Sequence, residues 1–300
     1  MVCKVLGIVV FCEWTPNAAA QTPTTNNNRI EIKLAELEEG NPLVEYRKAL
    51  IKLAMEASGK EYSLTKCDVS SGSTSDFRYA ELIKEGVRCN MLATSAGGDA
   101  TGKLMIIPFP IYLGGGGYRV LLANARSIKG SESIKSLADL RKYKVGSGLG
   151  WVDTKIMSEN GFDVVKSNYY NLFDMLRVGR FEYLTRSIYE ASSELALNGR
   201  DGELIIVPNI LLHYPVDLFF YVTPGREDIK NSMLDGLVKL YNSGLYEKFL
   251  SEHESTKNSL LVVKPETRII LEIENRRLTF EERSALEKFK SKWIRELNPH

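Results

Sequence analysis

Hydrophobic and polar residues in the first part of the chain repeat with two different periods. Over residues 29–35, isoleucine and leucine alternate with charged residues, which is the two-residue period of a half-buried strand. From residue 42 onward, apolar residues recur every three or four positions, as in an amphipathic helix. Asn41 is the expected N-cap of this helix, Pro42 its first residue and Gly59 its end. The pattern predicts a strand followed by a helix.

The alternation of the two periods continues along the chain. The next predicted elements are a strand at 62–67, a helix at 76–84 and a strand at 89–94. Strands that alternate with helices are typical of a parallel α/β sheet. Residues 96–117 are rich in glycine and contain two prolines, which predicts a loop that crosses to a second unit.

A second α/β unit is predicted from the apolar strand at 118–123 onward. Its predicted helices are 134–143, 153–160, 170–178 and 188–197, and its predicted strands are 144–147, 164–167, 183–185 and 203–207. A strand at 218–222 and an amphipathic helix at 228–243 follow. Near the end, Thr279 and Glu282 have the spacing of a capping box, which predicts a helix from Thr279 to Leu297.

Composition narrows the class of protein. The 300 residues are 44% hydrophobic and 26% charged, as in an ordinary soluble globular protein. The 39 basic and 38 acidic residues give a net charge of +1 and are interspersed, so no field attracts nucleic acid. After the first twenty residues, no apolar run is long enough to span a bilayer.

The first twenty residues have the pattern of a secretory signal peptide. Lys4 precedes an apolar run at 5–11, and three alanines end at Ala20. We therefore expect residues 1–20 to be removed and the mature chain to be periplasmic, with a buried first strand as the alternative. Export leaves Cys67 and Cys89, which can form a disulfide or remain as buried thiols.

Signatures of enzymes and metal sites are missing from the sequence. The three histidines, His213, His253 and His300, have no partner at the spacing of a metal site or a catalytic triad. The four glycines at 114–117 precede a strand and lack the lysine of a phosphate-binding loop, so we interpret them as a turn or hinge. We expect no metal and no cofactor.

One predicted turn has the features of a ligand-binding site. The predicted strand 144–147 leads through glycine-rich residues into a helix that starts near Asp153, and backbone N–H groups at such a turn can face an anion. Trp151 can stack on a ligand or pack in the core, and Asp153 can contact a ligand or cap the helix.

Several stretches of the sequence also resemble those of a known protein family. Ser-Leu-Ala-Asp-Leu at 136–140, Val-Gly at 145–146, Gly-Trp-Val-Asp-Thr at 150–154 and the stretches 175–183 and 188–191 occur in this order. Together they resemble bacterial extracellular solute-binding proteins of family 3, the amino-acid-binding type of type II periplasmic binding proteins. The resemblance covers the chain from about residue 29 to residue 271.

The resemblance implies a two-lobed α/β fold of the type II periplasmic-binding-protein kind, joined by two hinge strands. Residues 28–120 and 217–300 would form lobe 1, and residues 121–216 would form lobe 2, with hinges at 118–123 and 216–221. A monomer would hold a small polar ligand between its lobes for an ABC-type permease.

Departures from the family pattern affect the expected ligand. The stretch 94–103 has Lys103 where an arginine usually holds a ligand carboxylate, and Arg186 lies near the place of an acidic residue that usually binds an amino group. An acidic or hydroxylated metabolite bound by Arg186 is therefore one interpretation, and an ion pair between Arg186 and Glu182 or Glu190 is the other. The predicted ligand-binding residues are Thr94, Ser95, Tyr118, Arg119, Ser147, Gly148, Trp151, Asp153, Thr154, Arg186 and Glu190.

Two other functions compete with transport. A sensor for a membrane signalling partner would have the same two lobes, and the C-terminal helix could dock that partner. A dehydratase-like enzyme on this scaffold would need little more than one acid or base, for which Glu190 is the candidate.

Overall fold

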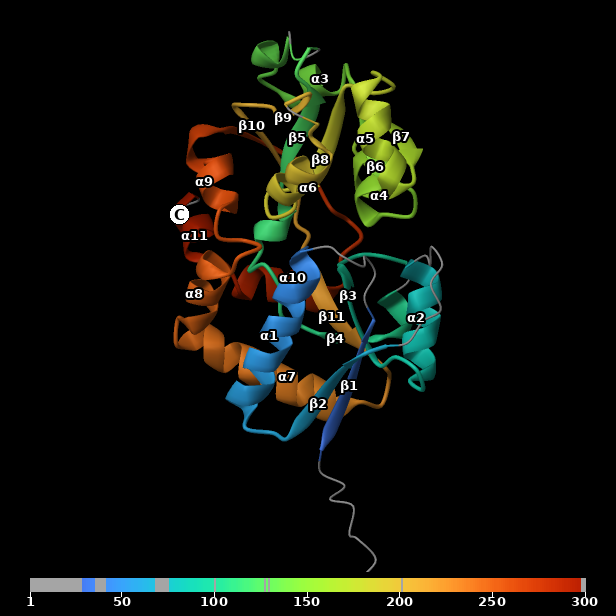
Figure 1. Ribbon diagram of the computed structural model, residues 1–300, viewed down its shortest axis with the longest axis vertical. Coiled ribbons are helices and arrows are strands. Elements are labelled where there is room, and N and C mark those ends of the chain that lie inside the picture. Colours follow the sequence, from blue (N-terminus) through green and yellow to red (C-terminus); the bar gives the residue numbers. More distant parts are fainter. Residues whose placement is uncertain are drawn as a thin grey trace, which may run out of the picture.

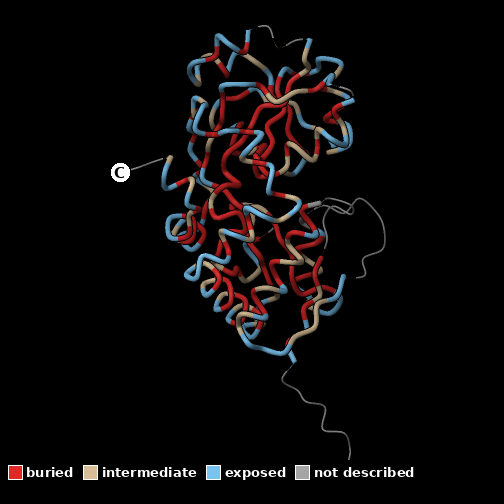
Figure 2. Tube along the Cα trace, turned by 60° about the vertical axis from the view of Figure 1, so that its left-hand side comes forward, coloured by how far each residue is buried: buried red, intermediate tan, exposed pale blue. Residues whose placement is uncertain are grey.

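The computed structural model describes residues 29–35, 42–67, 76–99, 101–126, 128, 130–200 and 202–297. The chain folds into two α/β lobes, each built around its own sheet (Figure 1). Figure 2 shows that buried residues run through the middle of both lobes and that exposed residues cover their outer sides. The expected signal peptide at 1–20 and the expected N-cap Asn41 lie outside the described residues.

Lobe 1 contains a five-stranded sheet in the order β2-β1-β3-β11-β4. Its strands are β1 (Ile30–Ala35), β2 (Tyr62–Lys66), β3 (Met91–Ser95), β4 (Met105–Ile107) and β11 (Leu218–Val222). Its helices include α1 (Pro42–Ser58), α2 (Asp76–Glu85), α7 (Glu227–Asn242) and α8 (Leu245–Glu252). β1, β2 and β3 are parallel, as the strand and helix alternation predicted, and β11 is antiparallel to β3 and β4.

A glycine sets how closely two helices of lobe 1 approach. A Cβ atom on Gly236 of α7 would lie 1.8 Å from the carbonyl oxygen of Ala54 on α1. Only glycine allows this approach, so it fixes α7 against α1.

Lobe 2 contains a seven-stranded sheet in the order β12-β10-β5-β8-β6-β7, with β9 paired to β5. Its strands are β5 (Tyr118–Asn124), β6 (Lys144–Gly148), β7 (Asp163–Ser167), β8 (Tyr183–Ser187), β9 (Leu204–Ile206), β10 (Ile210–His213) and β12 (Ile269–Glu272). Its helices include α3 (Leu137–Leu140), α4 (Val152–Glu159), α5 (Tyr169–Arg177), α6 (Ala191–Asn198) and α9 (Ser259–Val263). The chain ends with α10 (Phe280–Lys288) beside lobe 1 and α11 (Lys292–Leu297).

The connections between the two sheets lie beside the expected hinge strands. β5 pairs with β8 and β10 in lobe 2 from its first residues, and β11 pairs with β3 in lobe 1 along its whole length. The expected hinge strands 118–123 and 216–221 thus pair within a single sheet over most of their length. The chain crosses at 108–117 and 214–217.

Two further crossings were not expected, one that leads from α8 into α9 and β12 and one that leads back. β12 pairs with β10, so part of the segment 217–300 that was assigned to lobe 1 lies in the sheet of lobe 2. The chain then returns to lobe 1 through residues 273–279.

Several other element predictions need correction. The predicted helix 134–143 is reduced to α3, the predicted loop 96–117 contains β4, and the predicted helix 279–297 is divided into α10 and α11. α8, α9, β10 and β12 were not predicted. The capping box is confirmed, because the Thr279 hydroxyl accepts from the Glu282 N–H and Glu282 accepts from the Thr279 N–H.

The structure decides between the two interpretations of the cysteines. Cys67 and Cys89 form a disulfide, with their Cα atoms 5.2 Å apart, and both residues are buried. The disulfide joins the end of β2 to the residues before β3.

None of the helices in the described residues combines the length and apolar character that a membrane span requires.

Candidate functional site

Five charged residues gather at one edge of lobe 2, where β5, β8 and the starts of α4 and α6 meet. This charged cluster consists of Arg119, Asp153, Arg186, Glu190 and Glu194. Arg119, Asp153, Arg186 and Glu194 are buried, with only 4% to 8% of each residue exposed. Buried charges require partners because water no longer solvates them.

Asp153 and an aromatic ring hold Arg119. One terminal nitrogen of the guanidinium group lies 2.9 Å from Oδ1 of Asp153, and the group stacks 5.4 Å from the ring centre of Tyr214. The Tyr214 hydroxyl donates to Asp153. Burial is the largest single effect and opposes the charge of Arg119, but the interactions with Asp153, Tyr214 and Glu190 together outweigh it and raise the pKa of Arg119. Arg119 is therefore fixed and charged.

Arg186 is bound by two carboxylates and an indole ring. Two of its nitrogens donate to the two oxygens of Glu194 at 2.6 Å each, and a third contact reaches Oε2 of Glu190 at 3.0 Å. Its guanidinium group lies 4.5 Å from the ring centre of Trp151. Tyr169 donates to Glu194 at 3.1 Å. Carboxylates of the protein thus bind Nε and Nη2 of Arg186, as the ion-pair interpretation held for Glu190, with Glu194 as the main partner.

The turn before α4 places Trp151. The Thr154 hydroxyl oxygen lies 2.7 Å from both Ser147 Oγ and the Gly148 carbonyl oxygen, which ties the start of α4 to the end of β6. A Cβ atom on Gly148 would lie 2.2 Å from the Trp151 ring, so glycine is needed there. Asp153 is not the N-cap of α4, which is Trp151. The capping interpretation of Asp153 is wrong because its carboxylate binds Arg119.

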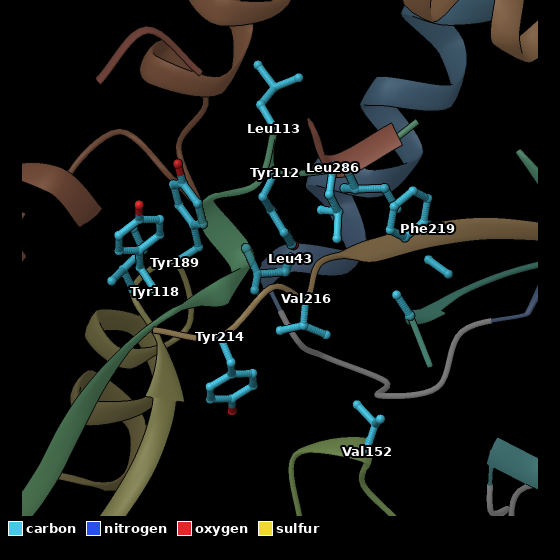
Figure 3. Close-up of a cluster of buried hydrophobic side chains, with 14 of the residues drawn as sticks. Leu43, Tyr112, Leu113, Tyr118, Val152, Tyr189, Tyr214, Val216, Phe219 and Leu286 are labelled. Carbon is cyan, nitrogen blue, oxygen red and sulfur yellow. The ribbon is translucent and has the colours of Figure 1, made fainter. Parts of the chain in front are cut away.

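Three of the predicted site residues lie apart from the charged cluster. Tyr118 is the neighbour of Arg119 on β5, so the two side chains point to opposite faces of the strand. The centre of the Tyr118 ring lies 4.3 Å from that of His213 and 4.8 Å from that of Trp293. Figure 3 shows Tyr118 beside Tyr189, with Tyr214 pointing away from both. Thr94 and Ser95 lie in lobe 1, on the last residues of β3, where they pair with β11. The contacts of Tyr118 are those of a core residue.

The sequence reasoning missed three members of this site. Glu194, Tyr169 and Tyr214 come from α6, α5 and the crossing 214–217. Glu194 had a signal, because it follows Glu190 by four residues and so shares its face of a helix. Tyr169 and Tyr214 are distant in sequence from the residues that they contact, and no local pattern identifies them.

The charges of the cluster do not favour an anion. Three carboxylates face two guanidinium groups, and both arginines are already paired. Lys103, the cation expected in lobe 1, binds Glu81 at 3.0 Å on the surface. Among the described residues, no group of histidine, cysteine, aspartate and glutamate side chains could hold a metal ion.

Comparison with known proteins identifies the fold. No model of a known protein family matches the sequence, and no curated protein matches it. Solved structures do match. One, which concerns glutathione import through GshT and the cystine ABC importer TcyBC of Streptococcus mutans, is 15% identical with a TM-score of 0.54 and covers 75% of this chain and 95% of that chain.

Two further structures broaden this likeness. The amino-acid ABC transporter substrate-binding protein AbpA from Streptococcus pneumoniae, bound to L-arginine, is 16% identical with a TM-score of 0.52 and covers 77% of this chain and 96% of that chain. A histidine kinase sensor domain with similarity to periplasmic binding proteins is 16% identical with a TM-score of 0.50 and covers 74% of this chain and 93% of that chain. The chain therefore has the two-lobed fold of periplasmic binding proteins.

Proposed function

We propose that this chain is a periplasmic solute-binding protein of the amino-acid-binding type, which closes around a small polar solute and delivers it to an ABC-type importer. The observation that carries the proposal is the charged cluster, built from strand ends of lobe 2 in the fold of transporter-associated binding proteins. Export through the signal peptide at 1–20 belongs to the same proposal.

The ligand that fits the charged cluster carries a positively charged group such as an ammonium. Glu190 is the most exposed member of the cluster, with 20% of its side chain exposed. In the described part of the chain, Arg186, Arg119 and the Ser187 N–H all contact the same oxygen of Glu190, Oε2. Oε1 is therefore the acceptor that we assign to the ligand, beside the half-buried ring of Trp151. Thr94 and Ser95 would contribute from lobe 1.

A thermal-shift screen of residues 21–300 tests the proposal. The panel holds amino acids, amines, organic acids and sugars. A ligand at one hundred times its Kd adds about 2.7 kcal/mol of stability, which raises the Tm by roughly 5 to 10 °C. We expect hits among compounds with an ammonium group and a loss of most of the shift in Glu190→Gln, whereas Glu132→Gln, on an exposed turn, keeps it. No hit, or a hit that Glu190→Gln leaves unchanged, would contradict this assignment.

A sensory role is the second candidate, favoured by the likeness to a histidine kinase sensor domain. Uptake of the radiolabelled hit by cells that lack this protein separates the two roles. Transport predicts lost uptake, and sensing predicts unchanged uptake with altered gene expression. The solved structures reported above are binding proteins and a sensor domain, which gives the dehydratase-like alternative no support.

A further inference from the structure

The last crossing, residues 273–279, leads from β12 back to lobe 1 and contacts both lobes along its length. On the side of lobe 2, the Ile273 N–H donates to the His213 carbonyl oxygen at 2.9 Å. Asn160, at the end of α4, donates to the Glu274 carbonyl oxygen at 2.8 Å and accepts from the Glu274 N–H at 3.2 Å. The start of the crossing is therefore fixed to lobe 2.

The other end of the crossing is fixed to lobe 1. Arg277 donates through Nε to the Gly97 carbonyl oxygen at 3.2 Å. Glu282, in the first turn of α10, accepts from the Gly97 N–H at 3.2 Å and from the Tyr221 hydroxyl at 2.6 Å. Gly97 and Tyr221 belong to the sheet region of lobe 1, so the two ends of one short segment hold different lobes.

Charges of the two lobes meet at the guanidinium group of Arg277. One terminal nitrogen binds Glu159 of α4 at 2.8 Å, and the other binds Asp99, which follows β3. Lys155 of α4 also binds Asp99. We name these four residues, Asp99, Lys155, Glu159 and Arg277, the inter-lobe ion network. Asp99 comes from lobe 1 and Lys155 and Glu159 come from lobe 2, so the contacts exist only while the lobes are close together.

We propose that Arg277 is a positioning residue that sets ligand affinity by stabilising the closed arrangement of the lobes, without touching the ligand. This inference rests on the proposed function, because closure matters for affinity only if a solute binds between the lobes. Apparent affinity scales with the fraction of molecules in the binding-competent arrangement. The network is partly exposed, so each of its ion pairs shifts the closure equilibrium by about two- to fivefold, and salt weakens it.

The first test needs no ligand. Donor and acceptor fluorophores on unnatural amino acids at Lys52 of α1 and Lys166 of β7, both exposed, report the distance between the lobes by energy transfer. We expect Arg277→Ala to move the distribution to longer distances. Arg276→Ala is the matched control, because Arg276 pairs with Glu274 inside the crossing and should leave the distribution unchanged. An unchanged distribution in Arg277→Ala would overturn the proposal.

Salt and a second variant complete the test. Sodium chloride at about 1 M should lengthen the distance in the wild type and have little effect on Arg277→Ala. Lys155→Met removes charge from the α4 side and should also lengthen the distance, so the test stands even if Arg277→Ala folds poorly. With a compound from the thermal-shift screen, Arg277→Ala should raise Kd by about five- to tenfold. A screen without hits would reject the proposed function. A distance between the lobes that changes neither in Arg277→Ala, nor in Lys155→Met, nor with salt would reject this inference alone.

Discussion

Arg186 and Glu194 form a buried ion pair, with about 5% of each side chain exposed. Two parallel hydrogen bonds, the Trp151 ring and the Tyr169 hydroxyl replace the water that these charges lose. Such a pair contributes little net stability, but either charge left alone would be costly. The pair therefore fixes the shape of the charged cluster.

Removing one partner should be strongly destabilising. We expect Glu194→Ala to lower the free energy of unfolding by about 3 to 5 kcal/mol, because Arg186 would remain buried with less compensation. Urea denaturation followed by circular dichroism measures the change. The double variant Arg186→Met, Glu194→Leu should recover much of the loss, and Glu254→Gln, in an exposed pair with Lys257, should change stability by less than about 0.5 kcal/mol. A small effect of Glu194→Ala would show that the pair is not buried as described.

At the scale of elements, the disulfide connects β2 to the entry of β3. Its two cysteines are separated by 22 positions in the sequence, and the segment between them contains α2. Closing a loop of this size reduces the conformational freedom of the unfolded chain. The disulfide therefore ties β2, at the edge of the lobe 1 sheet, to β3, the central strand that carries Thr94 and Ser95.

Loss of the disulfide should weaken the whole chain. We expect the variant Cys67→Ala, Cys89→Ala to lose about 3 kcal/mol of unfolding free energy, by the chain-entropy relation. Urea denaturation of the exported protein measures this loss. Mass spectrometry after thiol alkylation without reductant should find neither cysteine modified. Two modified thiols, together with an unchanged urea midpoint, would contradict the pairing.

At the scale of the whole molecule, Asp217 connects two of the crossings. Its carboxylate accepts N–H groups of Tyr112 at 3.0 Å and Gly114 at 2.8 Å, while it lies itself in the crossing 214–217. Figure 3 shows Tyr112 and Val216 in this region. Burial raises the pKa of Asp217 to about 7, against the effect of these N–H groups, which favour the charged form.

This shift predicts a dependence of stability on pH. The pKa of Asp217 is about 3.9 in the unfolded chain and about 7 in the folded chain, so between these pH values the unfolded chain releases the proton more readily. The contribution of Asp217 to stability is therefore full below about pH 3.9 and is lost as the pH rises to about 7. The loss amounts to roughly 4 kcal/mol. Urea denaturation from pH 4 to pH 8 should show this decline in the wild type relative to Asp217→Asn. Parallel curves for the two proteins would rule it out.

Much of the fold could be predicted from local patterns. Most of the helices and strands from β1 to α7 were predicted from such periods or from short apolar runs, and the structure contains them. β4, β10 and β12 are three or four residues long, too short for a period to identify. The division between α10 and α11 also has no local signal, because the Ser291 N–H donates to the carbonyl oxygen of Leu113 in a distant crossing.

The sequence by itself determined the two α/β units, the helix ends at Gly59 and Thr279, the turn that carries Trp151 and the presence of Arg119, Asp153, Arg186 and Glu190 near strand ends. Short-range hydrogen bonding, capping and periodic burial control these features, and each is encoded within a few residues. Only the tertiary structure decided which charges meet. The partners of Arg186 and Arg277 come from separate elements, and burial in a shared low-dielectric region turned an expected anion site into an internally paired cluster.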